Sequence, residues 1–288
     1  MWLLYASGSA FFAGITSILA KCGIKKTDST VATAVRTVVI LIFSWLIVLA
    51  SGSGYQISAI SKKTLIFLVL SGAATGASWL CYFRALQLGD INKVVPIDKS
   101  STVLTIFLAL IFLHEGLSIF KFFAVFMIAA GILLMIEKKD VSKGKKGEGQ
   151  WFLYAWGSAF FASLTAILGK VGISGVDSNL GTAIRTTIVL IMACLMVFIS
   201  GRKNELCRIP KKEFIFIFAS GLATGASWLC YYGALQDGPA SVVAPVDKLS
   251  VLVTVLFSYI VFGEKLSKKS SLGLGLLVFG TILILASS

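Results

Sequence analysis

The chain contains one long stretch twice. Ser71–Ser101 and Ser220–Ser250 align without a gap at a constant offset of 149 residues, and 20 of their 31 positions are identical. The same offset pairs Trp2 with Trp151, so the repetition extends well beyond this stretch. Self-similarity at a fixed offset indicates one structural unit used twice. What each unit contains therefore decides the fold and the candidate site.

Composition indicates the environment of these units. The chain is 57% hydrophobic and 14% charged, whereas soluble domains carry roughly 25% charged residues. Apolar runs of about 20 residues recur, and each is long enough to cross a membrane as a helix. We predict an all-α membrane protein with ten transmembrane helices. They are expected at 2–20, 31–50, 65–86, 92–113 and 119–136 in the first unit, and at 151–169, 180–199, 214–235, 241–262 and 270–286 in the second.

The number of helices per unit fixes the relation between the units. We expect a first unit at 1–137, a hydrophilic linker at 138–150 and a second unit at 151–288. After five crossings, an odd number, the second unit enters the membrane upside down. The prediction is therefore two inverted-topology five-helix repeats, related by a pseudo-two-fold axis in the membrane plane.

The loop charges favour the same arrangement. Lys25–Lys26 of the first unit corresponds to Ser174–Gly175 of the second, while Ser53–Gly54 corresponds to Arg202–Lys203. Equivalent loops thus carry opposite charge patterns, as expected if they lie on opposite faces. By the positive-inside rule, we expect a multi-pass protein of the cytoplasmic membrane with both termini outside. This also explains the net charge of +13 without a nucleic-acid partner.

Few residues are suited to catalysis or metal binding. The five cysteines show no C-x-x-C spacing, His114 is the single histidine, and no Gly-rich phosphate-binding loop precedes a helix. We therefore expect no metal site, no cofactor and no enzymatic activity.

Repeated charges within the apolar runs are the first candidate pathway residues: Asp98, Lys99, Asp247 and Lys248. A charge at the centre of a transmembrane helix costs roughly 2.5–3.5 kcal/mol and needs a partner or a water-filled cavity. Pro96 and Pro245 precede these charges and each removes a backbone donor, which predicts a helix break with a role in gating.

Two arginines and four aromatic residues complete the candidate pathway. Arg36 and Arg185 either bind substrate or pair with an aspartate to fix helix register. The aromatic residues either line a cavity or form an interfacial belt; they are Trp79, Tyr82, Trp228 and Tyr231. The Gly-x-x-x-Gly patterns at 72–76 and 221–225 are typical of close helix–helix packing.

These features resemble a known superfamily. Each unit ends its fourth expected helix with Glu-x-Leu-Ser, at Glu115–Ser118 and Glu264–Ser267. Two such five-helix units resemble the drug/metabolite transporter superfamily, and within it a tandem pair of EamA-type domains, over essentially the whole chain. The Pro-x-Asp-Lys stretches resemble those of shorter, single-domain members. The resemblance implies a ten-helix inverted-repeat fold, a central cavity lined by the first, third and fourth helices of each unit, and movement of small organic metabolites, often outward.

The expected function is that of a secondary transporter. It would export a small polar or zwitterionic, amino-acid-like metabolite by alternating access, in contact with membrane lipid and with a proton or sodium ion as candidate coupling ion. The alternatives are a flippase for a lipid-linked carrier and a non-transport membrane sensor or enzyme.

Overall fold

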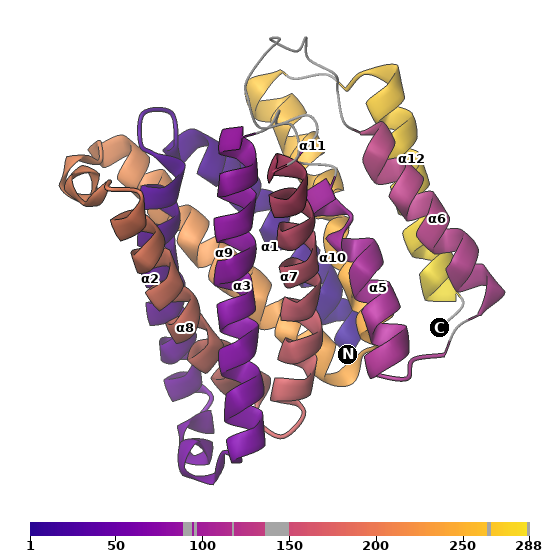
Figure 1. Cartoon of the computed structure of the whole chain (residues 1–288), viewed down its shortest axis with the longest axis horizontal. Helices are drawn as coiled ribbons and strands as arrows, with labels where there is room; N and C mark the ends of the chain where they lie inside the picture. Colours follow the sequence, from indigo (N-terminus) through magenta and orange to yellow (C-terminus); the bar gives the residue numbers. More distant parts are fainter. Residues whose placement is uncertain (89–93, 95–96, 117, 136–149, 264–265, 287–288) are drawn as a thin grey trace.

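Long apolar helices form a bundle in the computed structural model of the chain (Figure 1). The structure describes residues 1–88, 94, 97–116, 118–135, 150–263 and 266–286. Within these residues the chain is helical and contains no β-strand. Eight of the described helical segments are long and apolar enough to cross a membrane, judged by length and composition. The predicted all-α membrane class is confirmed.

The described elements follow the expected spans closely. The first half contains α1 (Trp2–Gly23), α2 (Ser29–Ala50), the 3₁₀ helix η1 (Ser53–Ala59), α3 (Lys62–Leu88), α5 (Ser101–Phe112) and α6 (Ile119–Leu134). The second half contains α7 (Gln150–Ile173), α8 (Ser178–Ile199), the 3₁₀ helix η2 (Lys203–Arg208), α9 (Lys211–Asp237), α10 (Ala240–Lys248), α11 (Ser250–Phe262) and α12 (Lys268–Ala286). The sequence did not predict η1 and η2. Most of the expected linker at 138–150, and part of the expected helix 92–113, lie outside the described residues.

Aspartates start the second helix of each half. The Asp28 carboxylate accepts a hydrogen bond of 2.9 Å from Thr30 N, and Asp177 accepts one of 3.0 Å from Asn179 N. Such side chains satisfy backbone donors that a helix leaves unpaired at its N-terminus. Each cap ends a short connection, residues 24–28 before α2 and 174–177 before α8.

The expected helix at 241–262 is interrupted. Pro245 lies inside α10, which ends at Lys248, and α11 begins at Ser250. A proline cannot supply its i→i−4 hydrogen bond and weakens the helix around it. The first half has a break at the equivalent position, since Ser100 precedes α5. Pro96, the predicted break residue there, lies outside the described residues.

The long helices of each half pack mainly against helices of the other half. Helix α1 lies along α9 and α3 lies along α7, while α2 packs on α8. Helices α6 and α12 lie side by side at one edge of the bundle (Figure 1). Every one of these pairs takes one helix from each half, so the two halves meet along most of their long helices.

Glycines permit the close approach that the Gly-x-x-x-Gly patterns predict. A Cβ atom added at Gly72 of α3 would lie 2.8 Å from the carbonyl oxygen of Arg185 in α8. The equivalent Gly221 of α9 faces α2, where an added Cβ would lie 2.7 Å from Cβ of Val39. Both distances are shorter than a normal van der Waals contact, so only glycine fits without a shift. Helices α3 and α8 are thereby brought together around Arg185.

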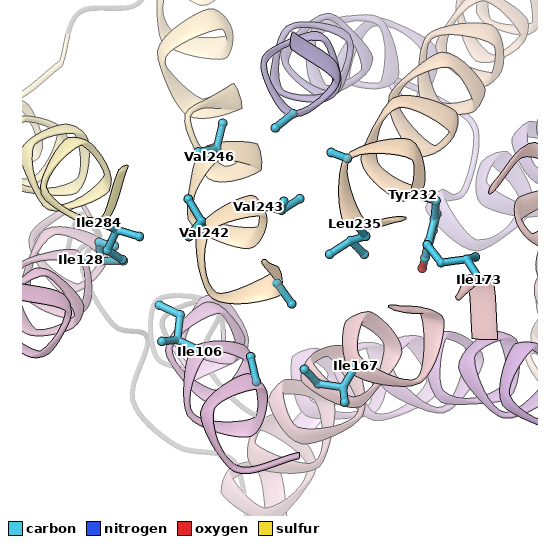
Figure 2. Close-up of a cluster of buried hydrophobic side chains, with 14 of the residues drawn as sticks. Ile106, Ile128, Ile167, Ile173, Tyr232, Leu235, Val242, Val243, Val246 and Ile284 are labelled. Carbon is cyan, nitrogen blue, oxygen red and sulfur yellow. The ribbon is translucent and has the colours of Figure 1, made fainter. Parts of the chain in front are cut away.

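The core surrounds α10. Its side chains Val242, Val243 and Val246 are buried, and Figure 2 shows them between apolar residues of neighbouring helices, including Ile106 and Leu235. The outer faces of the bundle instead expose large apolar side chains such as Leu4, Leu49, Phe126, Leu153 and Ile199. An apolar outside around a packed inside is typical of helices surrounded by lipid.

Loops of opposite halves also meet. Arg202, just before η2, forms a salt bridge of 2.9 Å with Asp28 in the loop between α1 and α2. Gln56 of η1 accepts a hydrogen bond of 2.9 Å from the backbone N–H of Asp177, in the loop between α7 and α8. The first loop of each half therefore contacts the second loop of the other half.

Candidate functional site

A cavity of about 270 Å³ lies between the two halves. Its walls come from α1, α3, α7, α8, α9 and α10. Among the described residues the lining is Ala13, Thr75, Ser78, Trp79, Ala162, Thr165, Ala166, Arg185, Ser227, Trp228, Tyr231, Tyr232, Asp247 and Lys248. Six of the predicted pathway residues are thus brought together: Trp79, Arg185, Trp228, Tyr231, Asp247 and Lys248.

Arg185 is the most enclosed charge in this cavity, with an exposed fraction of 3%. Its Nε donates a hydrogen bond of 3.2 Å to Ser71 Oγ, and its Nη2 donates one of 3.0 Å to Thr75 Oγ1. Its guanidinium carbon lies 4.9 Å from the ring centre of Trp228 and 4.6 Å from that of Tyr232, within cation–π range. Nη1 is buried and has no hydrogen-bond partner among the described residues.

Asp247 joins the second half to the first. Its Oδ1 accepts a hydrogen bond of 2.6 Å from Ser9 Oγ of α1, and its Oδ2 lies 3.4 Å from Nζ of Lys248. Ser9 is in turn 3.3 Å from the hydroxyl of Ser227. The acid is therefore already compensated by a hydroxyl and a neighbouring ammonium group.

Asp98 repeats this contact in the first half. Its Oδ1 accepts a hydrogen bond of 2.6 Å from Ser158 Oγ of α7, and Ser158 lies 3.3 Å from the hydroxyl of Ser78. Its neighbour Lys99 is exposed. Asp98 and Lys99 are not among the described residues that line the cavity.

Arg36 and Tyr82 occupy other surroundings. Arg36 lines a separate hollow of about 80 Å³ between α1, α2 and α9, and its buried Nε has no hydrogen-bond partner among the described residues. The Arg–Asp pair that was one alternative for Arg36 does not form with Asp98 in the described part of the chain. Tyr82 packs against the buried cluster of Ala85, Val94 and Ala155 and does not line the central cavity.

Sequence reasoning missed the serines that bind the two aspartates. Ser9 and Ser158 occur in the same hexapeptide, Gly-Ser-Ala-Phe-Phe-Ala, at 8–13 and 157–162. An unchanged polar residue inside an apolar run of both repeats was the available signal. Within helices of a membrane protein, such a hydroxyl needs a partner on the same or a neighbouring helix.

Glu115 determines where α10 begins. Its Oε1 accepts a hydrogen bond of 2.6 Å from Ala240 N and its Oε2 accepts one of 2.9 Å from Ser241 N. Lys170 donates from Nζ to the carbonyl oxygens of Leu235 and Gly238 just before this point. A carboxylate at a helix N-terminus is favoured by the free N–H groups and the helix dipole. The start of the helix that carries Asp247 is thus held by the other half. Glu264, the equivalent of Glu115, lies outside the described residues.

A hollow of about 320 Å³ lies at the loop end of the bundle, beneath η1. The one charged side chain among its described lining residues is Asp177, which already caps α8. No group of three His, Cys, Asp or Glu side chains that could hold a metal occurs in the described ranges. The central cavity is therefore the candidate site. Its charged lining residues are two cations, Arg185 and Lys248, and one acid, Asp247, which already has partners in the protein; tryptophan and tyrosine rings form an aromatic wall.

Comparison with known proteins gives the family. The model of the EamA-like transporter family matches residues 1–137 and again 149–286. An uncharacterized transporter in the cobO 3' region of a Sinorhizobium species is 47% identical over 134 residues, which are 46% of this chain and 95% of that protein. An uncharacterized protein of Methanocaldococcus jannaschii is 32% identical over 101 residues, covering 35% of this chain and 72% of that protein. Since the aligned part is nearly all of the first relative and under half of this chain, that relative has about the length of one repeat.

A solved crystal structure shares the fold. It superposes with a TM-score of 0.78 at 16% sequence identity and covers 98% of this chain and 96% of that chain. At this identity the likeness shows the fold alone. The double match of the family model shows that the chain is a multi-pass membrane protein and belongs to the EamA-like transporter family, within the drug/metabolite transporter superfamily.

Proposed function

We propose that the chain is a secondary transporter that moves a small polar or zwitterionic, amino-acid-like metabolite outward across the cytoplasmic membrane by alternating access. The central cavity carries this proposal, because both halves build it and it contains Arg185, Asp247 and Lys248. Buried charges around a hollow between transmembrane helices are a hallmark of a substrate or ion pathway. The volume of about 270 Å³ is below the roughly 300–1,000 Å³ of drug-sized pockets, which favours a small metabolite.

The transporter works, in this proposal, with two inverted halves of five membrane-crossing helices each. The salt bridge between Asp28 and Arg202 supports the inversion, because residues on one face are separated by an even number of crossings. The loop with Asp28 follows the first helix of the first half, and the loop with Arg202 follows the second long helix of the second half. If each half has n membrane-crossing helices, n + 1 crossings lie between these two loops. Because n + 1 has to be even, n is odd. The contact between Gln56 and Asp177 supports the same count at the other face. With an odd number of helices, the second half is upside down relative to the first.

Alternating access requires contacts that can exchange between the halves. The hydrogen bonds Ser9–Asp247 and Ser158–Asp98 are equivalent in the two repeats, and each crosses the interface. We assign Asp247 and Lys248 to the pathway in the state described here, and Asp98 and Lys99 to the state that opens to the other face. The break beside Pro245 lets α10 tilt separately from α11. Both aspartates are candidate acceptors for a coupling proton or sodium ion.

Counterflow into proteoliposomes tests the function. Vesicles that contain the purified full chain and are preloaded with an unlabelled solute should accumulate the same labelled solute, for at least one member of a panel of amino acids, amines and small organic acids. The double variant Asp98→Asn/Asp247→Asn should lose this exchange, while Asp237→Asn, which neutralises an exposed acid outside the cavity, should retain it. Exchange that is unchanged in the double variant would remove the two aspartates from the pathway. The absence of exchange for every solute in the panel would count against the transporter itself.

A further inference from the structure

The strongest unexplained feature of the cavity is the free end of Arg185. We propose that Nη1 of Arg185 is the docking point for a carboxylate of the substrate, so that the transported metabolite is a carboxylate-bearing molecule. This inference rests on the proposed function and names the chemical group by which the same site recognises its ligand.

The donors of Arg185 are only partly used by the protein. A guanidinium has five N–H groups and no acceptor. Ser71 accepts from Nε and Thr75 accepts from Nη2, whereas Nη1 is buried without a partner among the described residues. Arg185 lines the cavity and is otherwise 3% exposed, so the cavity is the space from which a ligand can reach this guanidinium. A buried polar group without a partner is costly, and binding an acceptor there removes that cost.

The charge balance identifies the acceptor as an anion. The groups that hydrogen-bond Arg185 are the neutral hydroxyls of Ser71, Thr75 and Tyr232, and no salt bridge to an acid is formed by Arg185 in the described part of the chain. The acid of the cavity, Asp247, is already engaged by Ser9 and Lys248. The lining charges of Arg185, Lys248 and Asp247 therefore leave one positive charge uncompensated. A guanidinium binds a carboxylate by charge-assisted hydrogen bonds in a geometry that matches both groups.

The arginine is held rigidly before any ligand arrives. Ser71 and Thr75 hold two of its nitrogens on one helix, and the rings of Trp228 and Tyr232 lie within 4.9 and 4.6 Å of its guanidinium carbon. A preorganised donor loses little entropy on binding. Trp79 and Ala166 supply apolar wall for the rest of the ligand. Arg36, the repeat equivalent, lines a separate hollow, so the site offers one such docking point in this state.

Matched carboxylate and amide probes test the inference directly. The purified full chain in detergent is titrated with 3-phenylpropionate and with 3-phenylpropionamide, and in parallel with L-phenylalanine and L-phenylalaninamide, and binding is measured from the ligand-induced rise in the melting temperature. We expect each carboxylate to bind roughly 10- to 100-fold more tightly than its amide, the range for a charge-assisted hydrogen bond in a buried site. Arg185→Gln should lose this preference. Arg185→Lys keeps the charge and should retain part of it.

Arg208→Gln is the matched control, because it removes an exposed guanidinium that does not line the cavity and should keep the full preference. Should Arg185→Gln not fold, the comparison of carboxylate and amide on the unmodified protein still decides. Equal binding of the two members of each pair, or no binding of either carboxylate, overturns the inference. A preference for carboxylate over amide that remains unchanged in Arg185→Gln also overturns the inference. Counterflow of a solute without a carboxylate would leave the transporter proposal standing and overturn the docking role of Arg185.

Discussion

The hydroxyl of Ser9 donates a hydrogen bond of 2.6 Å to the carboxylate of Asp247, and these two residues belong to different repeats. Ser158 and Asp98 form the equivalent bond, also at 2.6 Å. Each acid therefore depends on the first helix of the opposite half for its hydrogen bond. Two identical contacts across one interface are suited to a mechanism in which the halves move against each other while remaining coupled.

Removal of the serine hydroxyl should weaken this coupling. We expect Ser9→Ala to destabilise the protein by roughly 1–3 kcal/mol, because a hydrogen bond to an ionised group is lost and the acid keeps fewer partners. Combined with Asp247→Asn, its effect should be less than additive, since both changes remove the same interaction. Unfolding in detergent, followed by tryptophan fluorescence for the two single variants and the double variant, measures the coupling. Ser7→Ala is the control, since Ser7 is an exposed residue of the same helix. Strictly additive effects would show that the bond contributes nothing.

Two glycines of α12 should respond oppositely to the same substitution. A Cβ atom added at Gly273 would lie 2.6 Å from the carbonyl oxygen of Gly131 in α6, whereas nothing lies within 4 Å of one added at Gly275. Gly273→Ala should therefore cost about 1–3 kcal/mol through overpacking. Gly275→Ala should be neutral or stabilising by up to about 1 kcal/mol, because alanine favours the helix. Melting temperatures of the two variants in one detergent check the pair. Equal changes in melting temperature for the two variants would contradict the close packing of α6 against α12.

Much of the fold can be predicted because it depends on local patterns. Apolar runs give the helix spans, and the glycine spacing predicts that α3 and α9 approach their neighbours closely. The repeat also singles out Trp79, Trp228 and Asp247, which the structure brings to one cavity. The hydroxyl partners were not predicted, because a serine in an apolar helix does not reveal which neighbouring helix it faces.

The difference between Arg36 and Arg185 could not be read from the sequence at all. The two arginines correspond at the 149-residue offset, and each lies in the same Thr-Ala-x-Arg-Thr pattern, at 33–37 and 182–186. Yet Arg185 lines the central cavity while Arg36 lines a smaller hollow beside α1 and α2. A duplicated sequence predicts equal environments, whereas in the proposed inverted repeat a single conformation makes the two environments unequal. Only the arrangement in space shows which copy holds which role.

Glu115 should stabilise the start of α10 through its two backbone contacts. Glu115→Ala removes the acceptors of Ala240 N and Ser241 N and should cost about 0.5–2 kcal/mol, as for the loss of a helix cap. Glu115→Gln keeps an acceptor without the charge and should cost less. Hydrogen exchange of the Ala240 and Ser241 amides should accelerate in Glu115→Ala. Glu205→Ala, which removes an acid from a loop-surface pair with Arg202, should leave both amides unchanged. Unaltered exchange in Glu115→Ala would mean that the cap does not hold α10.

The loop contacts also predict the orientation of the chain. Asp28 meets Arg202 at one face, and in the proposed ten-helix arrangement this is the face with the greater number of basic loop residues, among them Lys25 and Lys26. Because basic loops are retained on the cytoplasmic side, that face should be cytoplasmic and the two chain ends should lie on the opposite side. Alkaline phosphatase, which is active only outside the cytoplasm, should be active when fused after Ser288 and inactive when inserted after Lys146. A fluorescent protein that matures only in the cytoplasm, placed at the same two positions, should give the reverse result. If both reporters placed Ser288 in the cytoplasm, the five-plus-five inverted arrangement could survive, but the assignment of inside and outside, and with it the outward direction of transport, would be reversed.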